Sequence, residues 1–293
     1  MEYAVRHRTL YRYAQSVSYS CHLAHLIPRA TSLQQVAEAD LQTSVPVSHR
    51  HAVTDYFGNA AEWFAVDQQH VTLEIVARSR VRVAPPEPLD AEKSLPWEQA
   101  RTRMEQDRDA EARDAIQYLF DSPLSTPTAG IAAYAAQSFT HKRPILAGAL
   151  DLMHRIHKEF RYDTTVTDAT TPVDRVFEMR SGVCQDLAHM GTACLRALGL
   201  PGRYVSGYLL TKPPPGKPRL LGADASHAWF SVWAPPFGWV DLDPTNDIRS
   251  SEGHVTLAWG RDYSDVAPIN GVVTGGGDHI VEVGVDVVPV EAA

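Results

Sequence analysis

Residues 180–200, RSGVCQDLAHMGTACLRALGL, join a glycine, a cysteine and a helical pattern in one short segment. Apolar residues recur there every three or four positions, which is typical of a helix with one buried face. They are Val183, Leu187, Met190, Cys194 and Leu198. Gly199 and Pro201 then favour the end of the helix. The segment therefore predicts a helix that begins next to Cys184.

The two cysteines of this segment have different predicted surroundings. Cys194 belongs to the apolar face, so we expect a core thiol there. Cys184 lies one step round the helix, in line with the small residues Ala188 and Gly191, where another element can approach closely. It also lies in the first turn, where free N–H groups and the helix dipole favour a thiolate and can bind an oxyanion. An isolated cysteine is most often a buried apolar residue. Only a base within reach of Cys184 would favour a nucleophile over such a structural cysteine.

A base is predicted on a hairpin that follows the helix. The segment DASHAWFSVWAPPFGWVDLDPTND, residues 224–247, indicates two strands joined by the tight APPFG connection. Of the thirteen histidines, His189 faces away from Cys184, because five residues turn a helix by about 140°. His227 lies at the start of the first strand and is the candidate base.

Strand alternation also identifies a carboxylate near His227. If Trp233 pairs with Trp239, Asp243 becomes a diagonal neighbour of His227 on the same face, ~7–8 Å away between backbones. Asp241 then lies one pair too far from His227. A one-residue bulge in the connection would shift this register. A thiol, an imidazole and a carboxylate that orients the imidazole are the arrangement used for acyl transfer.

The composition excludes several classes of function. The 293 residues are 44% hydrophobic and 21% charged, typical of a soluble globular protein with roughly two domains. A formal net charge of −8 without a basic run argues against a nucleic-acid partner. No apolar run reaches the ~18 residues that span a bilayer, and no signal-peptide pattern opens the sequence. We therefore expect a cytoplasmic protein with neither a nucleic-acid nor a membrane partner, and its oligomeric state stays open.

The cysteine content agrees with that compartment. Cys21, Cys184 and Cys194 are too few and too scattered for a disulfide framework or a zinc cage. Reduced thiols are therefore expected.

Changes in periodicity divide the chain into three parts. Strand-like alternation comes first, then a stretch rich in proline and charge followed by helical patterns, and finally β patterns again. The sequence thus predicts an α+β fold in which the helix with the cysteine packs on an antiparallel sheet. The expected units are an N-terminal β-rich domain (1–84), a linker and helical segment (85–145) and a core (146–293).

These motifs resemble those of the bacterial transglutaminase-like proteins, a family whose members are also described as cysteine proteases. The segments SGVCQDLAHM, LRALGLPGRYVSGYL, DASHAWFSVW and GWVDLDPTND stand in the order of the family's core motifs. HRTLYRY and DYFGNAAEWF resemble its N-terminal β region, and GRDYSDVAPINGV resembles its C-terminal segment. The resemblance covers nearly the whole chain.

The resemblance implies a papain-like transglutaminase core with Cys184 as nucleophile, His227 as base and Asp243 as orienting acid. It favours Asp243 over Asp241, because the family's acid stands in a DPT context. It also suggests Tyr162, in FRYD, as a side chain of the oxyanion hole, although eukaryotic relatives use a tryptophan. No calcium-ligand cluster is evident, and neither a cofactor nor a metal is implied.

The implied activity is cysteine-dependent acyl transfer on amide bonds through a thioester. Hydrolysis of peptides or peptide-like polymers, as by a peptidase or amidase, is favoured because water is always present and needs no second site. Protein-glutamine transamidation with an amine acceptor uses the same catalytic residues. An inactive binding scaffold of the same fold is the third alternative, and the intact triad argues against it.

Overall fold

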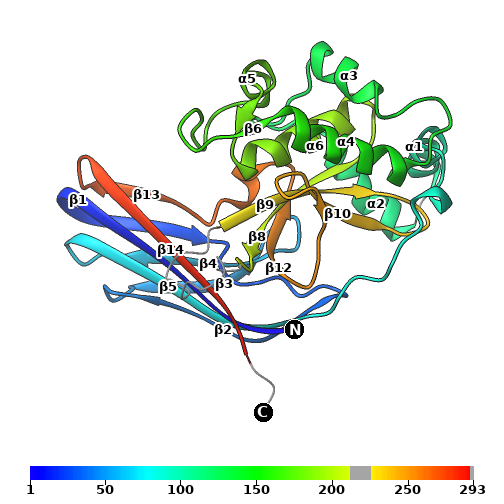
Figure 1. The fold of residues 1–293 in the computed structure, drawn as a ribbon. Helices are drawn as coiled ribbons and strands as arrows, with labels where there is room; N and C mark the ends of the chain where they lie inside the picture. Colours follow the sequence, from blue (N-terminus) through cyan, green and yellow to red (C-terminus); the bar gives the residue numbers. More distant parts are fainter. Residues whose placement is uncertain (108, 212–225, 291–293) are drawn as a thin grey trace, which may run out of the picture.

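The chain folds into two main β-sheets and a layer of helices in the computed structural model, which describes residues 1–107, 109–211 and 226–290 (Figure 1). The N-terminal part builds most of the first sheet, in the order β2–β5–β1–β4–β3. Its strands are β1 (Glu2–Ala24), β2 (Gln34–Thr43), β3 (His49–Thr54), β4 (Ala60–Val66) and β5 (His70–Val83). β1 is long enough to pair with β5 along its first half and with β4 along its second. One strand therefore organises this sheet.

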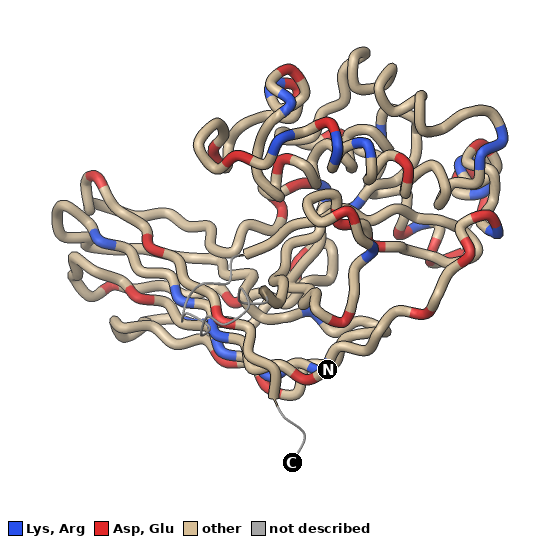
Figure 2. Tube along the Cα trace, in the orientation of Figure 1, with Lys and Arg blue, Asp and Glu red and all other residues tan. Residues whose placement is uncertain are grey.

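Alternation along β1 gives the N-terminal sheet two different faces. Its arginines Arg6, Arg8 and Arg12 all point to one face, because side chains two residues apart share a face of a strand. Arg8 pairs with Glu74 and Arg12 with Glu282 on neighbouring strands. Figure 2 shows these blue and red positions recurring along the strands. The opposite face carries the apolar and neutral side chains that pack toward the rest of the molecule.

The last two strands of the chain belong to the N-terminal sheet. β13 (Ile269–Gly275) pairs with the second half of β1, and β14 (His279–Pro289) pairs with its first half. Val285 and Val287 are fully buried there. Residues 146–293 are predicted to form one core, whereas β13 and β14 within this range lie in the N-terminal sheet. Their alternating pattern predicts strands but does not say which sheet they join.

The second sheet is antiparallel and has the order β11–β10–β9–β8–β12. Trp233 faces Trp239 and Asp241 faces Ser231, which is the register that alternation predicts for the hairpin. The strands are β8 (Gly202–Leu209), β9 (Ser226–Trp233), β10 (Trp239–Asp243), β11 (Ile248–Arg249) and β12 (His254–Gly260). This sheet carries His227 and Asp243 on neighbouring strands.

Apart from one short helix near the end of the chain, the helices lie between β5 and β8 in the sequence and cover one face of the second sheet (Figure 1). They are α1 (Trp97–Gln106), α2 (Ala110–Ile116), α3 (Ala129–Ala136), α4 (Ile145–Glu159), α5 (Val173–Met179), α6 (Cys184–Ala197) and, near the end of the chain, α7 (Tyr263–Val266). Short 3₁₀ turns are η1 (Ala91–Lys93) and η2 (Gln117–Leu119), and β6 (Arg161–Tyr162) pairs in parallel with β7 (Ser181–Gly182). Over the described part of the chain, no helix has the length and apolar character needed to cross a membrane.

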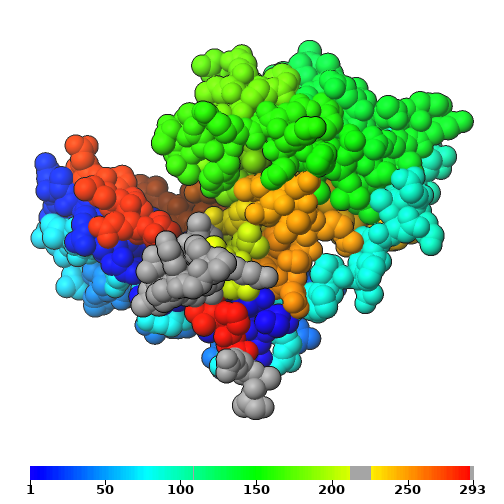
Figure 3. Space-filling view, in the orientation of Figure 1, coloured from blue at the N-terminus to red at the C-terminus, as the bar shows by residue number. Residues whose placement is uncertain are grey.

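The two sheets pack together through an apolar cluster that is separate from the main core beneath the helices. Tyr3 and Val5 of β1 and Val285 of β14 meet Tyr204 and Tyr208 of β8. Figure 3 shows that beyond this contact the molecule is hollowed between the orange-red strand β13 and the green helices. The packing therefore closes one end of the interface and leaves a cleft at the other.

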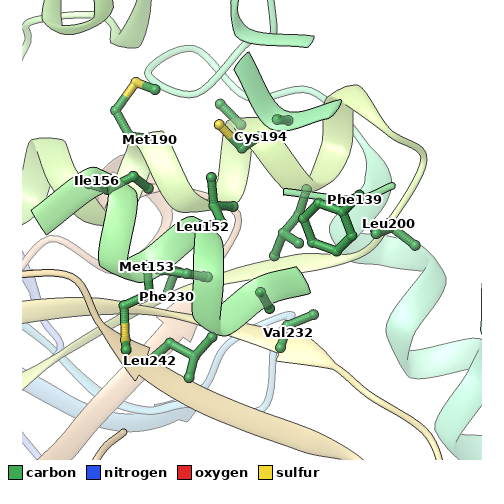
Figure 4. Packing of buried hydrophobic residues seen from close by; sticks show 14 of the residues in the cluster. Phe139, Leu152, Met153, Ile156, Met190, Cys194, Leu200, Phe230, Val232 and Leu242 are labelled. Carbon is green, nitrogen blue, oxygen red and sulfur yellow. The ribbon is translucent and has the colours of Figure 1, made fainter. Parts of the chain in front are cut away.

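The main core fixes α6 against β9 (Figure 4). The apolar side of α4, which includes Leu152, Met153 and Ile156, is buried in this core. A Cβ at Gly191 of α6 would lie 2.3 Å from Phe230 of β9, so only glycine allows this approach. Because α6 and β9 touch so closely, Cys184 at the start of α6 is brought beside the start of β9.

Candidate active site

A cavity of about 320 Å³ lies in the cleft between the N-terminal sheet and the second sheet. Cys184 and His227 line it from the core side. His7 and Thr9 of β1 and Val281 of β14 line it from the N-terminal sheet. The two sheets thus enclose the predicted nucleophile and base together.

Cys184 is held at the first turn of α6 by an acidic cap. The Asp186 carboxylate accepts hydrogen bonds from the Val183 N–H at 2.8 Å and from the Thr167 hydroxyl at 2.7 Å. A carboxylate that accepts from the residue before a helix fixes the direction in which the chain enters it. Cys184 is half-buried and borders the cavity, whereas Cys194 is fully buried and its burial raises the pKa of its thiol to about 12.

His227 lies between Cys184 and Asp243. Its Nε2 donates to Asp243 Oδ2 at 2.7 Å, and its ring lines the same cavity as the Cys184 thiol. Burial lowers the pKa of His227, but the hydrogen bonds and charges of Asp243 and Cys184 outweigh burial and raise this pKa to about 10. The imidazole therefore retains a proton next to the sulfur at neutral pH.

Asp243 is fully buried and surrounded by donors. Its Oδ1 accepts from the Thr245 N–H at 2.9 Å, and its Oδ2 accepts from Asn246 Nδ2 at 2.7 Å as well as from His227. Burial raises the pKa of Asp243, but the hydrogen bonds from His227, His254 and Asn246 lower it well below its usual range. The carboxylate therefore stays charged and fixed in orientation.

Asp241 has a different partner. Its Oδ2 accepts the indole N–H of Trp229 at 3.0 Å. Asp241 pairs with Ser231 and lies farther along the hairpin from His227 than Asp243 does, as the predicted register requires. Of the two aspartates, the structure therefore brings only Asp243 to His227.

His254, which no sequence pattern predicts as a site residue, is buried next to Asp243. Its Nε2 lies 3.2 Å from Asp243 Oδ2, and its Nδ1 accepts the Ser251 N–H at 3.0 Å. Because Nδ1 accepts a hydrogen bond, the ring proton is on Nε2 and is donated to Asp243. His254 begins β12, which is separated from β9 by β8. Only the strand order brings it to the site, so no local pattern in the sequence indicates it.

Tyr162 lies on the other side of Cys184. It is in β6, where its backbone pairs with Gly182, two residues before the cysteine. Partial burial and the charges of Cys184 and Asp186 raise the pKa of its hydroxyl, which therefore stays protonated and able to donate. Its side chain is 53% exposed and is not part of the cavity wall.

His227, Asp243 and His254 also form a set of potential metal ligands. Their ligand atoms all lie within 4.8 Å of one another. The distances of 2.7 Å and 3.2 Å between them are those of direct hydrogen bonds. A metal would have to displace both imidazole protons from the carboxylate, so the donor set fits a proton-sharing network better than a metal centre.

Family models match both parts of the chain. The bacterial transglutaminase-like N-terminal region matches residues 3–82, and the core of the transglutaminase-like superfamily matches residues 132–244. The second match includes Cys184, His227 and Asp243.

Two mycobacterial relatives cover nearly the whole chain, and a third relative covers part of it. An uncharacterized protein of Mycobacterium tuberculosis is 40% identical, covering 99% of this chain and 93% of the relative. One of Mycobacterium leprae is 30% identical, covering 97% of each chain. The protein-glutamine gamma-glutamyltransferase of Pseudomonas aeruginosa is 33% identical over 44% of this chain, which is 20% of that protein.

A solved structure shares the fold. The crystal structure of a candidate cysteine protease from Cytophaga hutchinsonii has a TM-score of 0.74, covering 100% of this chain and 92% of that one at 20% identity. Its N-terminal and core parts are therefore arranged as they are here.

Proposed function

Because the chain belongs to the bacterial transglutaminase-like family, we propose that it is a cysteine-dependent acyl-transfer enzyme that cleaves amide bonds. The observation that carries this proposal is that Cys184 and His227 line one cavity while His227 donates to the buried Asp243 carboxylate at 2.7 Å. Nucleophile, base and orienting acid within hydrogen-bond reach of one another are the requirement for thiol acyl transfer.

In the first half of the proposed reaction, His227 holds the proton of the Cys184 thiol, and the thiolate attacks the carbonyl carbon of the amide. A C–S bond forms and the carbonyl electron pair moves to oxygen. The electron pair on oxygen then re-forms the C=O bond as the C–N bond breaks, and His227 gives its proton to the amide nitrogen. The amine leaves and the acyl group remains on Cys184 as a thioester.

In the second half, water replaces the amine. His227, now neutral, takes a proton from water as its oxygen attacks the thioester. The C–S bond breaks, the acid is released and sulfur leaves as a thiolate beside the protonated imidazole. Asp243 keeps its charge throughout and holds His227 in the orientation that faces the sulfur.

The negative oxygen formed in each half requires donors. N–H groups in the first turn of α6, beside Cys184, are in position for this role, because the first N–H groups of a helix have no intrahelical partner. We propose the Tyr162 hydroxyl as the second donor, since Tyr162 pairs in β6 with Gly182, two residues before Cys184. Tyr162 would have to turn inward when substrate binds, because its side chain is partly exposed.

We favour hydrolysis of peptides or peptide-like polymers, because water needs no site of its own. The candidate cysteine protease with the same fold supports this choice. Transamidation of glutamine is the second candidate, favoured by the gamma-glutamyltransferase of Pseudomonas aeruginosa that matches part of the core. The two reactions differ only in the acceptor that attacks the thioester.

Two measurements test the proposal. A thiol-directed electrophile should label Cys184 faster than Cys21 or Cys194, and blocked glutamine peptides should lose ammonia or be cut only when Cys184 is present. Mass spectrometry with and without an added primary amine then separates hydrolysis from transamidation. Equal labelling of the three thiols together with no turnover would mean that the chain is a binding scaffold.

A further inference from the structure

A second cavity continues from the one at Cys184 along the N-terminal sheet. Its volume is about 460 Å³, and it shares Tyr11 and Ile269 with the first cavity. Tyr13, His22 and His279 line its floor. We call these five residues the neutral shelf. A substrate chain that reaches Cys184 has this surface directly beside it.

The two connected cavities contain no charged side chain of Lys, Arg, Asp or Glu among their described lining residues. Burial and the neighbouring His70 lower the pKa of His22 to about 4, so this ring is neutral at pH 7. The other face of the same sheet has a pocket lined by Arg6, Glu38 and Arg78, among other charged residues. Alternation along β1 therefore places charge on the outer face and keeps it off the face beside Cys184.

Two rings of the shelf are accessible for contact, those of half-buried Tyr11 and exposed His279, whereas Tyr13 and His22 are buried. Tyr11 and Tyr13 stack at 6.1 Å between ring centroids with an interplanar angle of 7°. The centroid of the His279 ring lies 6.3 Å from that of Tyr11 and 5.9 Å from that of Tyr13. Such rings bind apolar and aromatic groups at low cost in conformational entropy.

Backbone peptide groups also border the shelf, in addition to its aromatic rings. Gly271, Gly275 and Gly277 line the second cavity without side chains to cover their peptide groups. β13 pairs only with β1 among the described strands, so its other edge has no strand partner there, and Asn270 and Val273 of this strand line the second cavity. An open strand edge binds an extended polypeptide through main-chain hydrogen bonds. This feature favours a polypeptide over a glycan, which has no such repeating backbone donors.

We propose that the neutral shelf is a substrate subsite that binds an extended, uncharged polypeptide segment with apolar or aromatic side chains, adjacent to the amide that Cys184 attacks. The inference rests on the proposed function for the position of the amide, and it adds the class of sequence that flanks it. A Lys or Glu residue in this segment would lose hydration without gaining an ionic partner, and this loss disfavours binding.

The test measures equilibrium binding on the Cys184→Ala protein, so that its result does not depend on turnover. Three peptides of equal length carry the same glutamine and differ only in one flanking position, which is Phe, Lys or Glu. We expect the Phe peptide to bind at least about fivefold more tightly than either charged one. A short blocked glutamine peptide without flanks is assayed for turnover by the unmodified enzyme and tests the proposed function separately.

A charge placed on the shelf should reverse this preference. His279→Glu, added to the Cys184→Ala protein, should improve binding of the Lys peptide by about three- to fivefold and weaken binding of the Glu peptide. Arg12→Gln is the matched control, because it changes the net charge by the same amount on the opposite face of β1. It should leave the order of the three peptides unchanged.

Two results would overturn the subsite. One is equal binding of all three peptides by the Cys184→Ala protein. The other is the same change in preference with Arg12→Gln as with His279→Glu, which would reflect net charge rather than contact with the shelf. Binding of an uncharged oligosaccharide with no binding of the Phe peptide would also reject a polypeptide occupant.

Discussion

At the scale of single residues, the two cysteines of α6 differ in what surrounds them. Cys184 borders the same cavity as His227, whereas Cys194 lies in the main core. Cys184→Ala should therefore abolish amide turnover and leave the free energy of unfolding nearly unchanged. Cys194→Ala should retain activity and lose about 1–2 kcal/mol of stability, as a small truncation in a packed core. Urea denaturation and a peptide assay on both variants check this, and equal loss of activity in two folded variants would contradict it.

The two aspartates of β10 give a second pair of matched variants. Asp243→Asn should keep the fold but misorient His227 or change its tautomer, and reduce kcat by roughly 10²–10⁴. Asp241→Asn should cost less than about tenfold, because an amide oxygen can still accept the Trp229 N–H. Steady-state kinetics with circular dichroism as the folding control decide the matter. If Asp241→Asn were the inactive enzyme, the assignment of the orienting acid would be wrong.

At the scale of elements, the contact between α6 and β9 positions the site. Alanine normally favours a helix over glycine by about 1 kcal/mol. At Gly191 the added methyl group would overlap the ring of Phe230, which is fully buried and cannot move aside. Overpacking of this kind costs about 1–3 kcal/mol, so it outweighs the helix preference.

Gly191→Ala should therefore lower stability and also weaken kcat, since any shift of α6 moves Cys184 away from His227. Thermal unfolding and kinetics of this one variant provide the check. An unchanged or higher melting temperature with normal kcat would show that α6 and β9 are less tightly coupled than the contact implies.

The pairing of β14 with β1 makes a second prediction at this scale. Val285 is fully buried between the two sheets, whereas Val272 of β13 is 66% exposed. Val285→Ala should lower the free energy of unfolding by about 2 kcal/mol, and Val272→Ala by less than about 0.5 kcal/mol. Urea titration of both variants measures the difference. Equal effects would mean that the last strand contributes little to the joint between the sheets.

At the scale of the whole molecule, buried histidines make stability depend on pH. Burial lowers the pKa of His7, His22 and His189 to about 4 from an ordinary value of 6.5. The unfolded chain then binds more protons, so the stability from these groups is complete above pH 6.5 and is lost as the pH falls toward 4.

The contribution of His227 to stability changes with pH in the opposite direction. Its pKa is raised to about 10, so its contribution is complete below pH 6.5 and is lost as the pH rises through 10. The free energy of unfolding should therefore be greatest near neutral pH and fall on both sides. Urea denaturation at a series of pH values measures it, and His227→Gln should reduce the alkaline fall while the acid fall remains. If the free energy of unfolding of this variant still falls at alkaline pH, groups other than His227 cause that fall.

Local patterns in the sequence determined much of this molecule. Spacing of three and four residues predicts α6 and the position of Cys184 at its start, because a helical face needs only neighbouring residues to define it. Alternation around the APPFG connection predicts the pairing of Trp233 with Trp239, and with it the placement of Asp243 near His227. The catalytic roles of these residues stay predictions that the experiments above test.

The tertiary structure alone decided the features that join distant segments. β13 and β14 alternate as strands should, yet nothing in that pattern selects β1 rather than the second sheet as their partner. His254 reaches Asp243 because β12 lies next to β8, and the cavity at Cys184 has a wall from β1 because the two sheets pack face to face. The physical reason is the same in each case. Periodicity records which face of an element is buried, but the choice of what buries it depends on the free energy of the whole packed chain.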